Sequence, residues 1–136
     1  MTIEIGTKGI ATLTVSGLDL ATSLNQRPDD DFPAVFATTR MIGLMELAGS
    51  RALHPALKDG EVSVGVTVDI THTAATPIGE TVSAEATFTG KDGKLYVFEV
   101  IARDAGGEIG RGTHKRAIVS AERLLAGAAR RCAGPA

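Results

Sequence analysis

The chain of 136 residues contains no tryptophan, one tyrosine and four phenylalanines, and its formal net charge is only −2. A surface that binds nucleic acid needs a basic patch or aromatic rings on which bases stack. The shortage of both argues against a nucleic-acid partner. A hydrophobic content of 43% is typical of a folded chain, and this length fits a single domain, which we expect to span residues 1–136.

Cysteine is represented by Cys132 alone. A single cysteine cannot form a disulfide within the chain and has no partner for a metal cluster, so we expect a reducing compartment and no bound metal. The sequence also lacks an apolar run of the roughly 18–20 residues that span a bilayer, and its first residues lack the features of a signal peptide. We therefore expect a cytoplasmic protein without a membrane partner, and a flexible tail from about residue 132.

Alternation of apolar and polar residues predicts five strands. The alternation is most regular in residues 62–70, where valines at every second position are followed by Ile70. The other strands are expected over residues 9–16, 81–89, 95–103 and 108–119. Short turns separate the last four strands, including Asp92-Gly93, a dipeptide that favours hairpins. Because short turns join antiparallel neighbours, we expect an antiparallel sheet.

A helical period replaces the alternation from Thr38 to about His54. Five apolar side chains share one helix face, namely Met41, Leu44, Met45, Ala48 and Ala52. Thr38 or Thr39 is the predicted N-cap, and Pro55 marks the end of the helix. The helix is apolar nearly all round, which predicts that it is buried. A second helix is expected over residues 121–131, and an irregular connection with a short helical turn over residues 18–36.

The order of these elements predicts the fold. Five strands with one apolar face, and a single long helix to cover it, indicate an α+β protein in which a curved antiparallel sheet wraps around the helix. This is the hotdog fold. Such a half-sandwich leaves a sheet edge and part of the helix uncovered, so we expect a homodimer, with a tetramer as the alternative.

His72 and Glu46 are the first candidates for chemistry. Counting by two from Val62 reaches His72, so an unbroken strand would direct its imidazole towards the helix; the alternatives are a hydrogen-bonded core histidine or one turned outwards by a bulge. Glu46 is the only charged residue between Arg40 and Arg51. A buried carboxylate without a partner is costly, so Glu46 is either paired and functional or part of a narrow exposed stripe.

Thr38 completes a constellation suited to acyl transfer. Thr38 and Glu46 are spaced i, i+8 on one helix face, and a hydroxyl at a helix start lies beside free backbone N–H groups that can stabilise an oxyanion. A hydroxyl, a carboxylate and an imidazole from facing elements are the groups that such chemistry needs. His54 is expected at the surface, whereas His114 either lies on a strand surface or lines a cofactor groove.

Several segments carry a resemblance to a known family. Phe36–Thr38, Met41–Glu46, Thr71–Pro77 and Glu108–Ala117 stand in register within a match from about Phe32 to Val119. Over this stretch the chain resembles the fluoroacetyl-CoA thioesterase family of hotdog proteins. The resemblance implies a homodimer with the thioester in a tunnel near the subunit interface. It also implies no metal, and no cofactor apart from the coenzyme A of the substrate.

The resemblance assigns roles to individual residues. It implies that Thr38, Glu46 and His72 are catalytic and that Gly65 and Arg116 contact the acyl-CoA. We also expect Phe32 and Phe36 to bind the substrate.

The chain departs from the family pattern near the substrate. The family has an aromatic lid of two phenylalanines ahead of the helix, and Phe32 matches one of them while Asp29 stands at the other position. Thr39, Arg40 and Leu47 replace a glycine, an aromatic residue and a tryptophan. The resemblance therefore implies thioester hydrolysis but not selectivity for the fluoroacetyl group, because an open acidic loop excludes water less well.

The predicted function is hydrolysis of a short acyl-CoA to a carboxylic acid and CoA. The attacking group is Thr38, a water molecule or the carboxylate of Glu46, and the sequence leaves these routes open. One alternative is an enoyl-CoA hydratase of the hotdog type, which usually needs an Asp and a His that are absent between Thr38 and Gly49. Another is an acyl-CoA binding or sensing module, which could dispense with Glu46 and His72.

Overall fold

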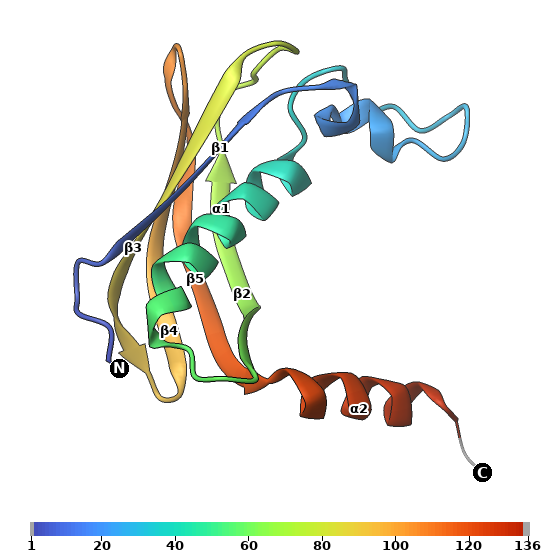
Figure 1. The fold of residues 1–136 in the computed structure, drawn as a ribbon. Helices are drawn as coiled ribbons and strands as arrows, with labels where there is room; N and C mark the ends of the chain where they lie inside the picture. Colours follow the sequence, from blue (N-terminus) through green and yellow to red (C-terminus); the bar gives the residue numbers. More distant parts are fainter. Residues whose placement is uncertain (1, 135–136) are drawn as a thin grey trace.

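A computed structural model describes residues 2–134, which form a five-stranded antiparallel sheet curved around one long helix (Figure 1). The strand order is β1-β3-β4-β5-β2, so β1 and β2 are the edges. In chain order the elements are β1 (Lys8–Thr14), the 3₁₀ turns η1 (Gly17–Asp19) and η2 (Ala21–Leu24), α1 (Thr38–Leu53), η3 (His54–Ala56), β2 (Glu61–His72), β3 (Thr81–Asp92), β4 (Leu95–Asp104), β5 (Gly107–Ser120) and α2 (Ala121–Cys132). The predicted curved sheet around a helix is confirmed.

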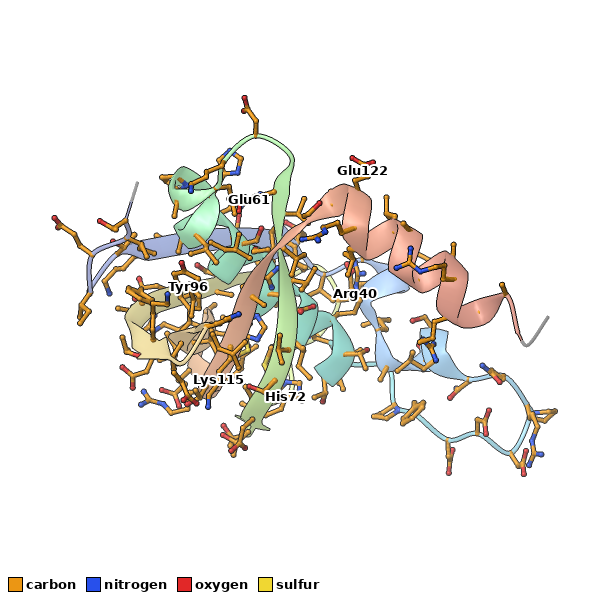
Figure 2. All side chains as sticks on the ribbon, turned by 90° about the horizontal axis from the view of Figure 1, so that it is seen from below. Arg40, Glu61, His72, Tyr96, Lys115 and Glu122 are labelled. Carbon is orange, nitrogen blue, oxygen red and sulfur yellow. The ribbon has the colours of Figure 1, made fainter. Side chains whose placement is uncertain are left out.

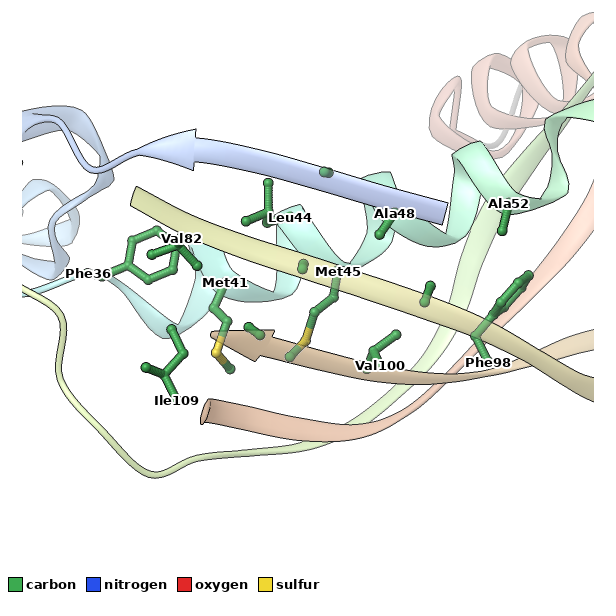
Figure 3. Packing of buried hydrophobic residues seen from close by; sticks show 14 of the residues in the cluster. Phe36, Met41, Leu44, Met45, Ala48, Ala52, Val82, Phe98, Val100 and Ile109 are labelled. Atoms are coloured by element: carbon green, nitrogen blue, oxygen red, sulfur yellow. The ribbon is translucent and has the colours of Figure 1, made fainter. Parts of the chain in front are cut away.

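The hydrophobic core fills the space between α1 and the concave face of the sheet (Figure 3). The helix face predicted from the 3.6-residue period supplies one side of it. The sheet supplies the alternating side chains of β3 and β4. The buried residues that meet here include Met41, Leu44, Met45, Ala48, Ala52, Val82, Ala84, Ala86, Phe98 and Val100.

Strand β1 packs backbone to backbone against α1. A Cβ added to Gly9 would overlap the carbonyl oxygen of Ala48 and lie 2.6 Å from the amide nitrogen of Ala52. Gly9 is therefore required by the close approach of strand and helix, not by a turn.

The start of α1 differs from the prediction, and only one face of the helix is covered. The N-cap is Ala37, which offers no side-chain acceptor, so the predicted Thr38 or Thr39 cap is wrong. The hydroxyl of Thr38 contacts another element instead, as described below. Gly43 and Leu47 are exposed, because the sheet covers only one side of the helix. Within one chain α1 is thus buried on one face only, and part of the helix is uncovered, as expected for a half-sandwich.

Strand β2 contains a bulge that the sequence pattern hid. Its register with β5 shifts between Gly65 and Thr67, so Val66 is an extra residue. Cross-strand partners share a sheet face, and the bulge therefore reverses the phase that was predicted from Val62. The residues on the concave face are Ser63 and Gly65 before the bulge, and Val68, Ile70 and His72 beyond it. His72 faces the helix as predicted, but it does so because the bulge shifts the alternation and not because the alternation from Val62 is unbroken.

The chain ends in α2, which extends away from the sheet and has no buried residue among those described (Figure 1). The predicted flexible tail falls partly on residues 135–136, which lie outside the described residues. No helix within residues 2–134 has the length and apolar character to cross a membrane.

We expect Gly9→Ala to lower the free energy of unfolding by about 2–4 kcal/mol, because the added methyl group meets backbone atoms that cannot move aside. Gly127→Ala in α2 is the matched control, since a Cβ there lies near only the tip of Arg130 at 3.9 Å. The control should raise stability by up to about 1 kcal/mol. Urea unfolding followed by circular dichroism measures both, and equal effects would contradict the close packing of β1 on α1.

Candidate active site

A pocket of about 410 Å³ opens at the N-terminal end of α1. Its walls come from the segment before α1, from the first turn of that helix, and from the end of β2 with the residues that follow. Most of the lining is apolar. The lining residues are Ala21, Leu24, Phe32, Pro33, Val35, Phe36, Thr38, Thr39, His72, Thr73, Ala74 and Ala75.

Thr38 and His72 meet at the wall of this pocket. The distance between Thr38 Oγ1 and His72 Nδ1 is 2.7 Å, a short hydrogen bond between the first residue of α1 and the last residue of β2. Nε2 of His72 is buried and has no hydrogen-bond partner among the described residues. Burial lowers the pKa of His72, an effect that the backbone of Ala74 opposes. The imidazole is therefore neutral near pH 7 and can accept a proton.

The first turn of α1 also offers hydrogen-bond donors to the pocket. The first N–H groups of a helix have no acceptor within it, and the N-cap Ala37 supplies none from its side chain. Thr38 and Thr39, the first two helical residues, both line the pocket. Their amides therefore lie where the oxygen of a bound carbonyl group can receive hydrogen bonds.

Asp19 anchors the pocket wall to α1. Its carboxylate accepts hydrogen bonds from the amide and hydroxyl of Ser16, and its Oδ1 lies 2.9 Å from Nε and 2.8 Å from Nη2 of Arg40. Asp19 is 5% exposed. The backbone hydrogen bond from Ser16 is the main reason that the pKa of Asp19 lies below its ordinary value, with Arg40 acting in the same direction against the effect of burial. The pocket wall is thus tied to the helix that carries Thr38.

Glu46 lies in a second polar cluster, further along α1. Its Oε1 is 3.6 Å from Nη1 of Arg116, and its side chain is 42% exposed. A Cβ added to Gly65 would overlap the Glu46 carboxylate, so this carboxylate rests directly on the β2 backbone. His114 completes the cluster, with Nε2 at 3.0 Å from the same Nη1 of Arg116.

The two clusters are separate within one chain. Eight residues of helix rise about 12 Å between Thr38 and Glu46, and no hydrogen bond joins Glu46 to Thr38 or His72 among the described residues. Figure 2 shows His72 on β2 and Arg40 on the first turn of α1.

Comparisons with known proteins identify the family. The family model described as "FlK: Fluoroacetyl-CoA-specific thioesterase" matches residues 20–122, more than half of the chain. A fluoroacetyl-CoA thioesterase from Streptantibioticus cattleyicolor is 47% identical over 96 residues, which are 71% of this chain and 69% of that protein. The chain belongs to this thioesterase family. The predicted resemblance is confirmed, and the protein is an acyl-CoA thioesterase.

Solved structures confirm the fold of this thioesterase. A structure of the fluoroacetyl-CoA thioesterase FlK matches it with a TM-score of 0.89 at 37% identity, over 99% of this chain and 100% of that one. A hot-dog-like protein from Thermanaerovibrio acidaminovorans matches with a TM-score of 0.83 at 24% identity, over 98% of this chain and 96% of that one. The predicted hotdog fold is therefore confirmed.

The structure divides the predicted site residues of the thioesterase between the two clusters. Thr38, His72, Phe32 and Phe36 line the pocket, whereas Glu46, Gly65 and Arg116 lie together further along α1. His54 is exposed, as predicted. His114 is 1% exposed, which excludes the first of the two alternatives for it, a residue on the strand surface.

Residue patterns alone did not indicate Asp19, Ser63 or Arg116. Arg116 was assigned only through the family resemblance, and His114 was left between a strand surface and a groove. Asp19 lies in the irregular connection, and Ser63 stands among valines as an ordinary polar strand residue. His114 and Arg116 occupy alternate positions of β5 on its buried side, but polar residues there read as a solvent-facing strand. The available signal was the pairing with β4, because the partners of His114 and Arg116 there are Phe98 and Tyr96, whose aromatic rings indicate a buried face. Within residues 2–134 no group of three or more His, Cys, Asp and Glu side chains is arranged to hold a metal ion.

We expect Asp19→Asn to lower the free energy of unfolding at pH 7 by about 1–3 kcal/mol, because the donors of Ser16 and Arg40 lose an ionised acceptor that is itself buried. The native pKa of Asp19 is below the unfolded value, so its contribution is complete above that value of 3.8 and is lost as the pH falls through the lower native pKa. The stability difference from wild type should narrow only below pH 3.8. Asp29→Asn, in an exposed pair with Arg27, is the control and should leave stability unchanged. A difference that does not depend on pH would contradict an ionised Asp19.

Proposed function

We propose that this thioesterase hydrolyses short acyl-CoA thioesters, with Thr38 and His72 as the reacting pair and Glu46 as the third catalytic residue. The observation that carries the proposal is the 2.7 Å hydrogen bond between Thr38 Oγ1 and His72 Nδ1 at the wall of the pocket. A hydroxyl bonded to a neutral imidazole is the arrangement that activates an oxygen nucleophile.

The lining of the pocket and the ligands of related structures support a short acyl group. Phe32 and Phe36 supply aromatic surface beside the reacting pair, and Phe32 is half exposed, so the pocket is open on that side. Mutants of the related enzyme FlK have been solved with fluoroacetate and with acetyl-CoA. A small acyl group in contact with Thr38 fits both the lining of the pocket and the ligands of these structures. Asp29, which replaces one of the two lid phenylalanines, argues against selectivity for the fluoroacetyl group.

The reaction follows from these positions. The neutral imidazole of His72 accepts the proton of the attacking oxygen, which belongs to Thr38 or to a water molecule held beside it. The thioester carbonyl oxygen gains negative charge and receives hydrogen bonds from the amides at the start of α1. The C–S bond then breaks, and the CoA thiolate takes the proton from His72. If Thr38 attacks, water hydrolyses the resulting acyl ester. The third possible nucleophile is the carboxylate of Glu46, whose attack gives an anhydride that water then hydrolyses.

A homodimer formed through β2 would bring the two clusters together. β2 is an edge strand, and Val66 and Val68 at its centre are 51% and 40% exposed, which is typical of an edge that pairs with another strand. Antiparallel pairing about a twofold axis sets the half of one β2 that carries His72 beside the half of the other that carries Gly65. Glu46 of the partner subunit would then approach Thr38 and His72.

We expect Thr38→Ala, Glu46→Gln and His72→Ala each to lower kcat by about 10²- to 10⁴-fold, because each removes a group that moves a proton or attacks. Thr38→Ser keeps the hydroxyl and should retain most activity, and His54→Ala at the exposed helix end is the matched histidine control. Thiol release from acetyl-, fluoroacetyl-, medium-chain and aryl-CoA measures the effects. Full activity in all three variants would reject the site, and binding without turnover in the wild type would indicate a sensing module.

An active site that combines His72 of one subunit with Glu46 of the partner subunit makes a sharper prediction. E46Q and H72A should each be inactive alone. When the two variants are mixed, unfolded and refolded together, about half of the dimers contain one chain of each. In such a dimer one site has both Glu46 and His72, and the other has neither. We therefore expect the mixture to recover about a quarter of wild-type activity. A mixture as inactive as its components would show that Glu46 and His72 act within one chain. Sedimentation of each variant confirms that the dimer itself is unchanged.

A further inference from the structure

His114 is a buried titratable group to which the mechanism above assigns no role. It lies on β5 between Phe98 of β4 and Val68 of β2 and is 1% exposed. Both ring nitrogens have partners: Nδ1 is 2.9 Å from the carbonyl oxygen of Thr67, and Nε2 is 3.0 Å from Nη1 of Arg116. A carbonyl oxygen only accepts and a guanidinium only donates. Nδ1 must therefore carry the proton, and Nε2 must accept.

This arrangement requires a neutral His114. Protonation of Nε2 would turn the acceptor into a donor that faces the donors of Arg116. Burial is the main cause that lowers the pKa of His114, and Arg116 lowers it further, against the carbonyl of Thr67 and the charge of Glu46. The ring is thus a fixed, neutral acceptor at neutral pH.

Arg116 is held by neutral acceptors on the side away from Glu46. Nε donates to Ser63 Oγ at 3.0 Å, and Nη2 donates to the Ser63 carbonyl at 2.9 Å. Nη1 has His114 Nε2 at 3.0 Å but Glu46 Oε1 only at 3.6 Å, beyond hydrogen-bond range. The guanidinium is therefore directed by Ser63 and His114, and its charge acts on Glu46 without a direct hydrogen bond.

The ring of His114 has little room to move. A Cβ on Gly49 of α1 would be 3.3 Å from Cδ of Arg116 and 3.4 Å from Cδ2 of His114, so the helix backbone packs tightly on this pair. A Cβ on Gly65 would lie 3.1 Å from Cε1 of His114 and overlap the carboxylate of Glu46. The ring of His114 is thus enclosed from both sides.

We propose that His114 is a positioning residue that holds Nη1 of Arg116 away from Glu46, so that the Glu46 carboxylate stays free to take part in thioester hydrolysis. Without the acceptor at Nε2, Nη1 has only Glu46 left to bond and closes the 3.6 Å gap. A carboxylate bound directly by a guanidinium is a weaker base and a weaker nucleophile. The inference rests on the proposed role of Glu46 and assigns His114 no contact with the substrate.

Two substitutions separate the two contacts of the ring. In His114→Gln the side-chain oxygen reaches the place of Nε2 and can accept from Arg116, whereas in His114→Asn the shorter amide keeps only the donor to Thr67. We expect His114→Asn to lower kcat about 10- to 100-fold with KM changed less than about threefold, a loss on the order of that found when a residue that orients a metal ligand is removed. His114→Gln should recover most of this loss. Equal losses in both variants would show a packing role only and overturn the proposal.

A double-mutant cycle tests the route through Glu46. If His114 acts on that carboxylate, His114→Asn should cause no further loss of kcat in the Glu46→Gln enzyme. Losses that multiply would overturn the proposal, because His114 would then act independently of Glu46. Thermal melts of every variant establish that it is folded.

Crystal structures of the two His114 variants give a readout that does not depend on turnover. The Arg116 Nη1 to Glu46 Oε1 distance should fall into hydrogen-bond range in His114→Asn and stay at its wild-type value in His114→Gln. An unchanged distance in His114→Asn would overturn the inference. A wild-type enzyme that hydrolyses no acyl-CoA would instead reject the proposed function, and the distance in the variants would still decide whether His114 sets the position of Arg116.

Discussion

The tight seating of α1 in the concave sheet is the constraint on which the rest of the structure depends. The helix approaches the backbone of β1 at Gly9, and it approaches β5 at Gly110, where a Cβ would lie 2.7 Å from the Met41 side chain. Because neither contact leaves space for a side chain, the helix has one position along the sheet. That position sets its first residue, Thr38, against the last residue of β2, and it sets Glu46 against the β2 backbone at Gly65.

The same seating separates two electrostatic environments along one helix. At the start of α1 the surroundings are mostly apolar, and burial keeps His72 neutral. Two turns later the surroundings are charged, and Glu46 faces a guanidinium that is itself mostly buried. Burial disfavours the charge on Arg116, and Glu46 favours it. A neutral imidazole and a buried guanidinium beside a carboxylate thus lie two turns apart along one helix.

Periodicity in the sequence was sufficient for the fold and for part of the site. The spacing of Met41, Leu44 and Met45 defined the face of α1 that meets the core, whereas the regular valines defined the existence of β2 but not which of its faces meets the helix. The bulge at Val66 escaped prediction since an inserted residue leaves alternation intact in the sequence while it changes the phase in the sheet. The N-cap was misplaced because Thr38 uses its hydroxyl for His72 rather than for the helix. The surroundings of His114 depend on register between distant strands, which local patterns do not report.

The segment between Asn25 and Val35 is stabilised mainly by its own residues. Asp30 accepts hydrogen bonds from the amides of Gln26 and Arg27. The segment is tied to the rest of the protein at its end, where the Val35 carbonyl accepts from the Ala21 amide and the next amide, that of Phe36, donates to the Thr76 carbonyl. The contacts that seat α1 in the sheet and the hydrogen bond between Thr38 and His72 are made by residues outside this segment. A change of sequence in this stretch thus alters the wall of the pocket, to which Phe32 and Pro33 contribute, and not the contacts that seat α1 in the sheet.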